Sequence, residues 1–152
     1  MANAIRFFGK DSPYAALSNF APHGFVEDSL RWPTVEHYFQ AQKFDDAAYR
    51  ERIRAAASPM QAKALGQSRA IPIRPDWDTV REDVMRRALR CKFAAPELRA
   101  LLLGTKRREL IEDSPYDRYW GAGRDGKGKN RLGHLLMELR EELSAATSPA
   151  AE

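Results

Sequence analysis

The sequence predicts a single compact, mainly α-helical (α+β) domain with a small β element near its N-terminus. Two long segments, residues 76–95 and 130–143, carry apolar residues at helical spacing. Strand-like segments are short, and most of them precede residue 33. A chain of 152 residues, 43% of them hydrophobic, suits one domain that buries about two-thirds of its unfolded surface. We expect this domain to span residues 1–143 and residues 144–152 to form a disordered C-terminal tail.

The predicted β element consists of short strands at residues 5–8, 24–28 and 30–32. Asp28 and Ser29 favour a turn, so we expect the last two strands to form a hairpin. A further strand is expected in the segment RELIED, well after the first helices.

The helices follow from capping residues and apolar spacing. Ser58, Pro59 and Gln61 form a helix start, with a capping hydroxyl, a proline at the first helical position and an amide three residues after the cap. Pro96 starts another helix, which Gly104 ends. The remaining helices are predicted at 34–44, 45–57, 76–95 and 130–143.

Composition restricts the classes of function. No apolar run approaches the roughly 20 residues that cross a bilayer, and the N-terminus lacks a secretory signal, so we expect a cytoplasmic protein with no membrane partner. Cys91 is the single cysteine, which excludes an internal disulfide, and the three histidines lack metal-ligand spacing. We expect no metal and no cofactor. The net charge of +4 suits a phosphorylated or nucleic-acid partner, but it is modest.

The segment WPTVEHYFQAQKF combines a buried helix pattern with polar residues on one side. At about 100° per residue, Glu36, Gln40 and Lys43 fall within roughly 60° of one another. One interpretation is a solvated stripe beside a core face. The other is a pocket in which nearby aromatic residues exclude water from the carboxylate and can hold a flat ring. His37 points elsewhere and is interpreted as structural or as a surface residue.

The segment GAGRDGKGKN, residues 121–130, matches G-x-G-x-x-G and nearly matches the P-loop pattern. Both matches are rejected, because too little chain follows to build the parallel sheet that either fold needs. Glycine-rich backbone with Lys127 and Lys129 before a helix still indicates a phosphate cradle, against the alternative of a flexible surface connection. Asp117 lies close to Trp120 in the sequence, which sets a carboxylate beside an indole that could stack on a base or flank a sugar. A tryptophan in such a position is, however, more often part of a core.

Four segments, in this order, resemble the NADAR family, also called the YbiA-like family. They are FFGKDSPYAALSNF, WPTVEHYFQAQKF, WDTVREDVMRRALRCKF and LIEDSPYDRYWGAGRDGKGKNRLGHLLMELR. The resemblance runs from about Phe7 to Arg140. It implies a compact helical domain that cleaves N-glycosidic bonds without a cofactor. Two substrate classes belong to the family: phosphorylated pyrimidine intermediates of riboflavin synthesis, and ADP-ribose attached to guanine in nucleic acid. Stand-alone bacterial members, which this chain resembles, are linked to the first.

The resemblance also assigns residues. It places the acidic position on Glu36 and polar or basic pocket positions on Asn19, Gln40 and Lys43. A second group of family positions falls on Asp117, Trp120, Gly121 and Asn130. Of these, Trp120, Gly121 and Asn130 are expected to bind the substrate, as are Asn19, Gln40 and Lys43.

Cleavage of an N-glycosidic bond builds positive charge on the sugar, so the site needs a carboxylate. Glu36 is predicted as the main catalytic residue, either as general base or as electrostatic stabiliser, with Asp117 sharing the task or orienting ribose hydroxyls. Lys43, or Lys127 and Lys129, would hold a phosphate. The predicted reaction releases ribose 5-phosphate from a ribosylaminopyrimidine phosphate.

Two alternatives remain at this point. The first is removal of ADP-ribose from guanine, for which a basic groove with Arg86, Arg87, Arg90 and residues 106–108 would argue. The second is a non-catalytic module that binds ADP-ribose or a related nucleotide. The sequence does not indicate an oligomeric state.

Overall fold

The structure, a computed structural model, describes residues 3–147. These residues form two compact units, one comprising Asn19–Lys92 and the other comprising the chain before and after it. Helices dominate both units, and each strand in the described part has three residues, which confirms the predicted mainly α-helical class. In chain order, the elements are β1 (Ile5–Phe7), the 3-10 helix η1 (Ala15–Leu17), β2 (Phe25–Glu27), β3 (Leu30–Trp32), α1 (Val35–Ala41), α2 (Ala47–Arg54), α3 (Pro59–Gln67), α4 (Trp77–Lys92), α5 (Pro96–Gly104), β4 (Leu110–Glu112) and α6 (Arg131–Thr147).

The predicted hairpin is confirmed. Strands β2 and β3 pair antiparallel, with Phe25 opposite Trp32. The turn residues Asp28 and Ser29 have φ values of 56° and 63°. Two successive left-handed residues match the right-handed twist of the flanking strands, which is why short polar residues occupy this turn.

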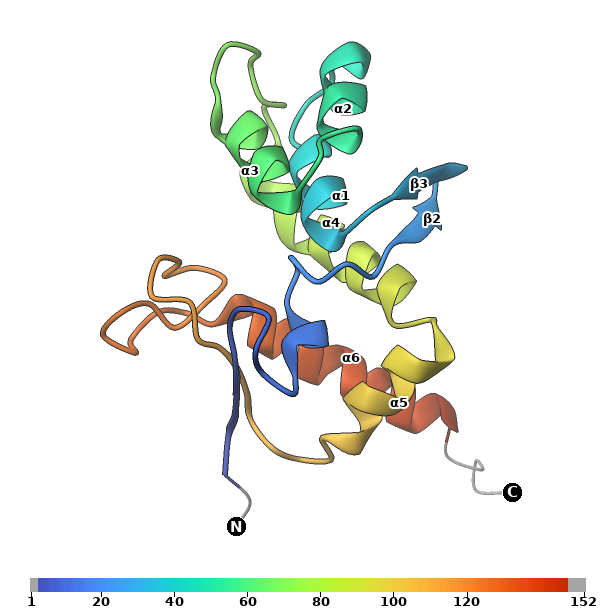
Figure 1. The fold of residues 1–152 in the computed structure, drawn as a ribbon, viewed down its shortest axis with the longest axis vertical. Helices are drawn as coiled ribbons and strands as arrows, with labels where there is room; N and C mark the ends of the chain where they lie inside the picture. Colours follow the sequence, from blue (N-terminus) through green and yellow to red (C-terminus); the bar gives the residue numbers. More distant parts are fainter. Residues whose placement is uncertain (1–2, 148–152) are drawn as a thin grey trace. The chain divides into compact units, whose positions relative to one another are not determined.

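Helix α1 is the buried element of the Asn19–Lys92 unit. Thr34 caps it by accepting a hydrogen bond from the backbone N–H of His37, 3.1 Å away. All seven of its residues are buried, and α2, α3, α4 and β3 pack against it (Figure 1). Tyr38 makes an edge-to-face contact with Trp32 at 5.2 Å between ring centroids, and Phe39 lies 5.0 Å from Trp77.

Capping fixes where the neighbouring helices begin. Asp46 accepts a hydrogen bond from the backbone of Tyr49 and starts α2. The predicted start of α3 is confirmed: Ser58 accepts from the backbone of Gln61, and the Gln61 amide accepts from the backbone of Ala57.

The other unit is organised around α6, which packs against β4 and α5. Strands β1 and β4 pair in parallel, with Ile5 opposite Leu110. Gly133 allows the close approach of helix and strand, because a Cβ on it would lie 2.1 Å from the carbonyl oxygen of Leu110. The apolar face of α6 is buried through Leu132, Leu135, Leu136 and Leu139.

The C-terminal ends of α1 and α6 differ from the predictions. The first helix ends at Ala41 rather than Phe44, because the N–H of Lys43 bonds to the Gln40 carbonyl three residues earlier and tightens the chain into a turn. The last helix continues to Thr147, where alanines favour it, so the predicted tail is wrong for residues 144–147. The rest of that tail, residues 148–152, lies outside the described residues.

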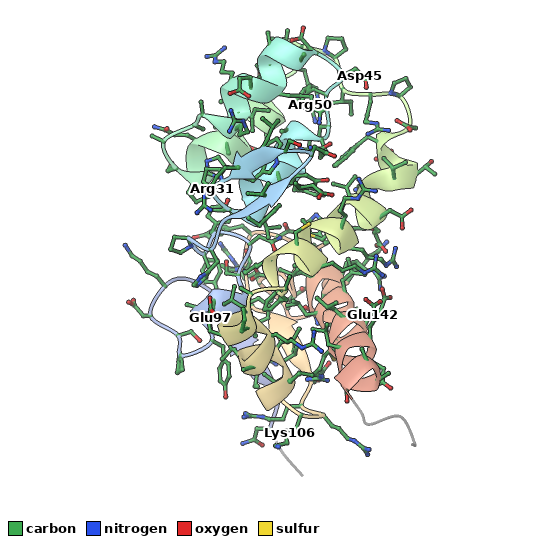
Figure 2. The ribbon with its side chains drawn as sticks, turned by 90° about the vertical axis from the view of Figure 1, so that its right-hand side faces the viewer. Arg31, Asp45, Arg50, Glu97, Lys106 and Glu142 are labelled. Carbon is green, nitrogen blue, oxygen red and sulfur yellow. The ribbon has the colours of Figure 1, made fainter. Side chains whose placement is uncertain are left out.

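Arg31, Asp45 and Glu97 are examples of charged side chains that lie on the outside of the two units (Figure 2). Within residues 3–147, no helix has the length and apolar character that a bilayer crossing needs.

Candidate active site

The polar side chains Glu36 and Gln40, which form the polar line of α1, are buried rather than solvated. Glu36 is 7% exposed and Gln40 is 5% exposed. The Gln40 Nε2 donates to Glu36 Oε2 at 2.7 Å. Glu36 Oε2 therefore acts as the hydrogen-bond acceptor toward Gln40. A buried carboxylate held by an amide is costly for a fold to maintain, which favours the pocket interpretation over the surface stripe.

Asn19, which the family resemblance assigns to the pocket, contacts α1 through its backbone. Its backbone carbonyl accepts from the N–H of Glu36 at 3.1 Å, which places the start of the unit against the first turn of α1. Its Nδ2 contacts the sulfur of Met85 at 3.6 Å. Within the described residues, the buried oxygens Asn19 Oδ1 and Gln40 Oε1 have no hydrogen-bond partner. A buried acceptor without a partner, such as Asn19 Oδ1, suits a ligand that brings hydroxyl or N–H donors.

Lys43 follows α1 in the turn and points toward the end of α3. Its Nζ donates to the carbonyl oxygen of Gly66 at 3.4 Å, and Arg69 donates to the same oxygen at 2.9 Å. The pKa of Lys43 is lowered to about 8, chiefly by burial and then by the positive charges of Arg69 and Lys63, while the carboxylate of Glu36 opposes this shift. Three cations and one carboxylate therefore share this corner of the Asn19–Lys92 unit.

The sequence does not predict three further residues of this corner, which are Lys63, Gly66 and Arg69. All three belong to α3 or to the turn after it, and helical spacing does place Lys63 and Gly66 on one face. Nothing in the local sequence, however, indicates that this face meets α1. The Nζ of Lys63 also lies 5.9 Å from the ring centroid of Phe20.

His37 is structural, and the alternative of a surface position is wrong because the residue is 1% exposed. Its Nδ1 lies 2.8 Å from Thr34 Oγ1, and its Nε2 lies 3.0 Å from the carbonyl oxygen of Ala56. A carbonyl only accepts, so Nε2 carries the proton and Nδ1 accepts from the threonine hydroxyl. Burial lowers the pKa of His37, partly offset by the bond to Ala56.

The second group of predicted site residues lies in the other unit. Asp117 Oδ1 accepts from the backbone N–H groups of Tyr119 and Trp120, at 2.9 and 2.7 Å, and so fixes the turn that presents Trp120. The indole is half-buried and packs edge-on against Tyr119 at 4.9 Å. Gly121 follows in a tight site, where a Cβ would lie 2.9 Å from the carbonyl oxygens of Asp117 and Glu112.

The backbone of the glycine-rich loop is largely engaged in its own hydrogen bonds, and the predicted phosphate cradle stays a prediction. Every backbone N–H from Gly126 to Leu132 already donates to an oxygen within the loop or the turn before it. Gly128, for example, donates to the carbonyl of Ala122 at 2.6 Å. The loop is therefore rigid through its own hydrogen bonds, and phosphate binding by the side chains of Lys127 and Lys129 stays a prediction.

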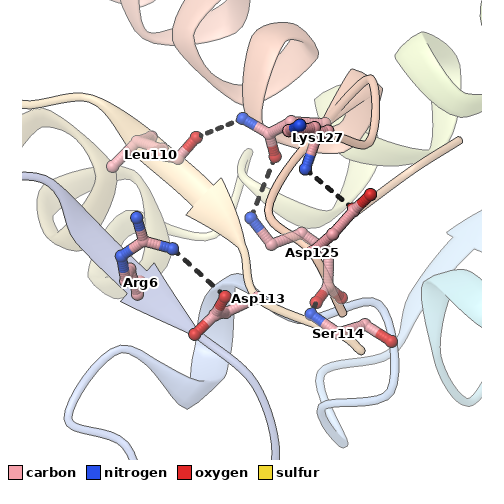
Figure 3. Close-up of polar contacts among 8 residues, drawn as sticks. Arg6, Leu110, Asp113, Ser114, Asp125 and Lys127 are labelled. Carbon is pink, nitrogen blue, oxygen red and sulfur yellow. Dashed lines mark hydrogen bonds and ion pairs between the residues drawn. The ribbon is translucent and has the colours of Figure 1, made fainter. Parts of the chain in front are cut away.

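Asn130 joins the loop to β4, the strand that carries the labelled Leu110 in Figure 3. Its Nδ2 donates to the carbonyl of Leu110 at 2.9 Å, and its Oδ1 accepts from the N–H of Glu112 at 2.9 Å. The residue has a φ of 50°, which asparagine tolerates better than most residues. Both polar ends of the side chain serve the fold, and its predicted contact with substrate stays a prediction.

A small polar hollow of about 160 Å³ lies beside the same loop. Arg6, Lys129 and His134 line it, together with Glu109. Arg6 pairs with Asp113 at 3.2 Å, and Lys129 lies 5.6 Å from the ring centroid of Tyr119.

The structure thus brings Asn19, Glu36, Gln40 and Lys43 together in one unit. It places Asp117, Trp120, Gly121 and Asn130 on one turn and loop of the other unit. The predicted meeting of Glu36 with Asp117 stays a prediction. In the part of the chain that is described, no three His, Cys, Asp or Glu side chains gather as a metal site.

Fold and site define a small, mainly helical domain with a buried carboxylate–amide pair next to a cluster of cations. The model of the NADAR domain matches residues 6–144, and the chain belongs to that family.

Relatives extend this result. The N-glycosidase YbiA of Escherichia coli (strain K12) is 54% identical over 141 residues, which are 92% of this chain and 88% of the relative. The chloroplastic riboflavin biosynthesis protein PYRR of Zea mays is 42% identical over 166 residues, which cover 99% of this chain but 27% of that longer protein. The NMR structure of the E. coli protein YbiA matches with a TM-score of 0.88 and 52% identity, over 95% of this chain and 86% of that chain.

Proposed function

We propose that the protein is an N-glycosidase that hydrolyses phosphorylated ribosylaminopyrimidine intermediates of riboflavin synthesis to the free base and ribose 5-phosphate. The observation that carries the proposal is the buried Glu36 carboxylate, which accepts a hydrogen bond from Gln40. The names of the relatives support the reaction class, N-glycosidase, and the metabolic context, riboflavin synthesis.

Glu36 is proposed as the group that activates water. A water oxygen forms a bond to the anomeric carbon as the carbon–nitrogen bond breaks, and the bonding electrons leave with the nitrogen of the base. The proton of the water passes to Glu36 and then to the departing base. The same negative charge stabilises the positive charge that develops on the sugar, so both predicted roles of the carboxylate act in one step.

The donors and acceptors around Glu36 suit a ribose. Asn19 Oδ1 is proposed to accept a hydrogen bond from a sugar hydroxyl. The backbone carbonyl of Asn19 bonds to the N–H of Glu36, which supports placing the ribose near the first turn of α1.

Lys43 is proposed to bind the phosphate. A dianionic phosphate relieves the repulsion among Lys43, Lys63 and Arg69, whereas an unphosphorylated sugar does not. The engaged backbone of the glycine-rich loop also favours this corner over the loop as the phosphate site.

Trp120 is proposed to stack on the departing base, with Asp117 holding the turn that presents it. Asp117 already accepts two backbone hydrogen bonds through one oxygen, so its proposed contribution to the reaction is to orient rather than to exchange a proton.

A nucleic-acid substrate has less support among the described contacts. Arg86 pairs with Glu82 and Asp83, and Arg87 pairs with Glu27. Arg108 donates to the backbone of Asn3. Side chains engaged within the protein are poorer phosphate contacts, because binding must first break these pairs.

The substrate is tested by incubating the purified protein with a ribosylaminopyrimidine phosphate, with its unphosphorylated counterpart and with an ADP-ribosylated guanine oligonucleotide. Mass spectrometry should detect ribose 5-phosphate from the first substrate and much slower cleavage of the second. Release of ADP-ribose from the oligonucleotide alone would move the function to nucleic acid. Binding without cleavage in all three incubations would indicate a non-catalytic module.

A further inference from the structure

Gly66, in the last turn of α3, packs against the side chain of Gln40 in α1. A Cβ on this residue would lie 1.9 Å from Gln40 Oε1 and 2.6 Å from Gln40 Cδ. These distances are far below any van der Waals contact, so the Gln40 amide lies in the space that a side chain on α3 would need. The same amide donates to Glu36 at 2.7 Å.

The carbonyl oxygen of Gly66 contacts Lys43, which follows α1 in the chain. It accepts from the Nζ of Lys43 at 3.4 Å and from Arg69 at 2.9 Å. One residue of α3 therefore provides the space for Gln40 and the acceptor for Lys43. The backbone conformation does not require glycine at this position, because Gly66 lies within a regular helix and does not have a positive φ.

We propose that Gly66 is a positioning residue for the reaction: its missing side chain seats Gln40 against α3 so that the amide fixes the Glu36 carboxylate, while its carbonyl fixes Lys43. The proposal rests on the proposed function only in that Glu36 and Lys43 act on the substrate. A larger residue must push the Gln40 amide away from α3 and so turn the carboxylate that it holds. Misplacing a catalytic group by about 1 Å can lower a rate by about 100-fold.

Gly104 provides a matched control within the same chain. It also lies in the last turn of a helix, α5, and a Cβ on it would meet nothing within 4 Å. In each helix a glycine-to-alanine change favours the helical backbone equally. The two substitutions therefore differ in what the new methyl group meets.

The experiment compares kcat, KM and melting temperature for the wild type, Gly66→Ala, Gly104→Ala, Gln40→Asn and the double variant Gly66→Ala/Gln40→Asn. Gly66→Ala should lower kcat by about 10- to 100-fold, with a smaller change in KM. Gly104→Ala should keep kcat within about twofold. Asparagine is one methylene shorter, so the double variant should recover the melting temperature that Gly66→Ala loses, but not its kcat, because the shorter amide no longer reaches Glu36.

A purely structural role gives a different result: kcat would return together with the melting temperature in the double variant, and the proposal would be overturned. If Gly66→Ala fails to fold, Gln40→Asn alone still tests the claim, since normal kcat in that variant contradicts it. A Glu36→Gln arm separates this inference from the proposed function. An inactive Glu36→Gln with a fully active Gly66→Ala refutes only the positioning role, whereas an active Glu36→Gln refutes the catalytic role itself.

Discussion

At the scale of single residues, Lys43 combines a predicted phosphate contact with an unusual titration. Its pKa of about 8 means that the ammonium loses its charge as pH rises through 8, within the range where the protein can be assayed. The charges that face it are Arg69, Glu36 and Lys63. The substrate phosphate is already a dianion above about pH 6, so Lys43 is the partner whose charge changes.

We therefore expect KM for a phosphorylated substrate to rise above pH 8 in the wild type. Lys43→Arg should flatten this rise, because arginine keeps its charge throughout. Steady-state kinetics between pH 7 and 9.5 measure both profiles. Identical profiles for the two proteins would remove Lys43 from phosphate binding, and an unphosphorylated substrate serves as the control that should show no rise in either protein.

His37 predicts a pH dependence of stability. Burial lowers its pKa in the folded state, so below about pH 6.5 the unfolded chain takes up a proton that the folded chain resists. The free energy of unfolding should then fall as pH drops from 6.5 toward 5. His37→Gln should lose about 1 kcal/mol at pH 7, by loss of a buried hydrogen bond, and should show a weaker pH dependence.

Urea unfolding at several pH values tests this expectation, with His134→Gln as control because His134 is exposed in α6. Parallel curves for the wild type and His37→Gln between pH 5 and 6.5 would contradict the assignment of the neutral, buried imidazole.

At the scale of elements, α3 matters because it presents Gly66 to α1. Its N-terminal cap, Ser58, lies at the opposite end of the helix from Gly66. Ser58→Ala should lower the free energy of unfolding by about 1 kcal/mol through the lost cap, while activity per folded molecule stays near normal. Denaturant unfolding measures the loss, and Ser144→Ala, at an exposed position of α6, is the control. Equal midpoints for the two variants would mean that the cap contributes nothing.

Elements whose signals are local could be predicted from the sequence. The Ser58 cap and the Asp28–Ser29 turn each depend on a few neighbouring residues, and both are confirmed. The ends of α1 and α6 were predicted wrongly, because a competing short-range hydrogen bond at Lys43 and continued alanine propensity after residue 143 decide them.

The candidate site could be predicted in part. Helical spacing indicates the line of Glu36, Gln40 and Lys43, and resemblance to the NADAR family assigns Asn19 and the residues from Asp117 to Asn130. The contact between Gln40 and Gly66 joins residues of two helices, and no local pattern carries such pairing. For the glycine-rich loop, composition does not indicate that the backbone N–H groups from Gly126 to Leu132 are used by hydrogen bonds within the fold.

At the scale of the whole molecule, the family match spans residues 6–144 and so includes both units. The Asn19–Lys92 unit holds the carboxylate, its amide and the cations, and the other unit holds the turn with Trp120. We therefore expect residues of both units to affect the same reaction, with Glu36 as the group on which the chemistry depends.

The measurement that tests this most directly is the rate of ribose 5-phosphate release by wild type and by Glu36→Gln, with circular dichroism to confirm equal folding. Glutamine keeps the shape of the side chain and removes its charge. We expect the variant to lose about 1,000-fold or more in kcat, in the range typical of a general base that also stabilises charge. A folded Glu36→Gln protein that turns over at a near-normal rate would contradict the account.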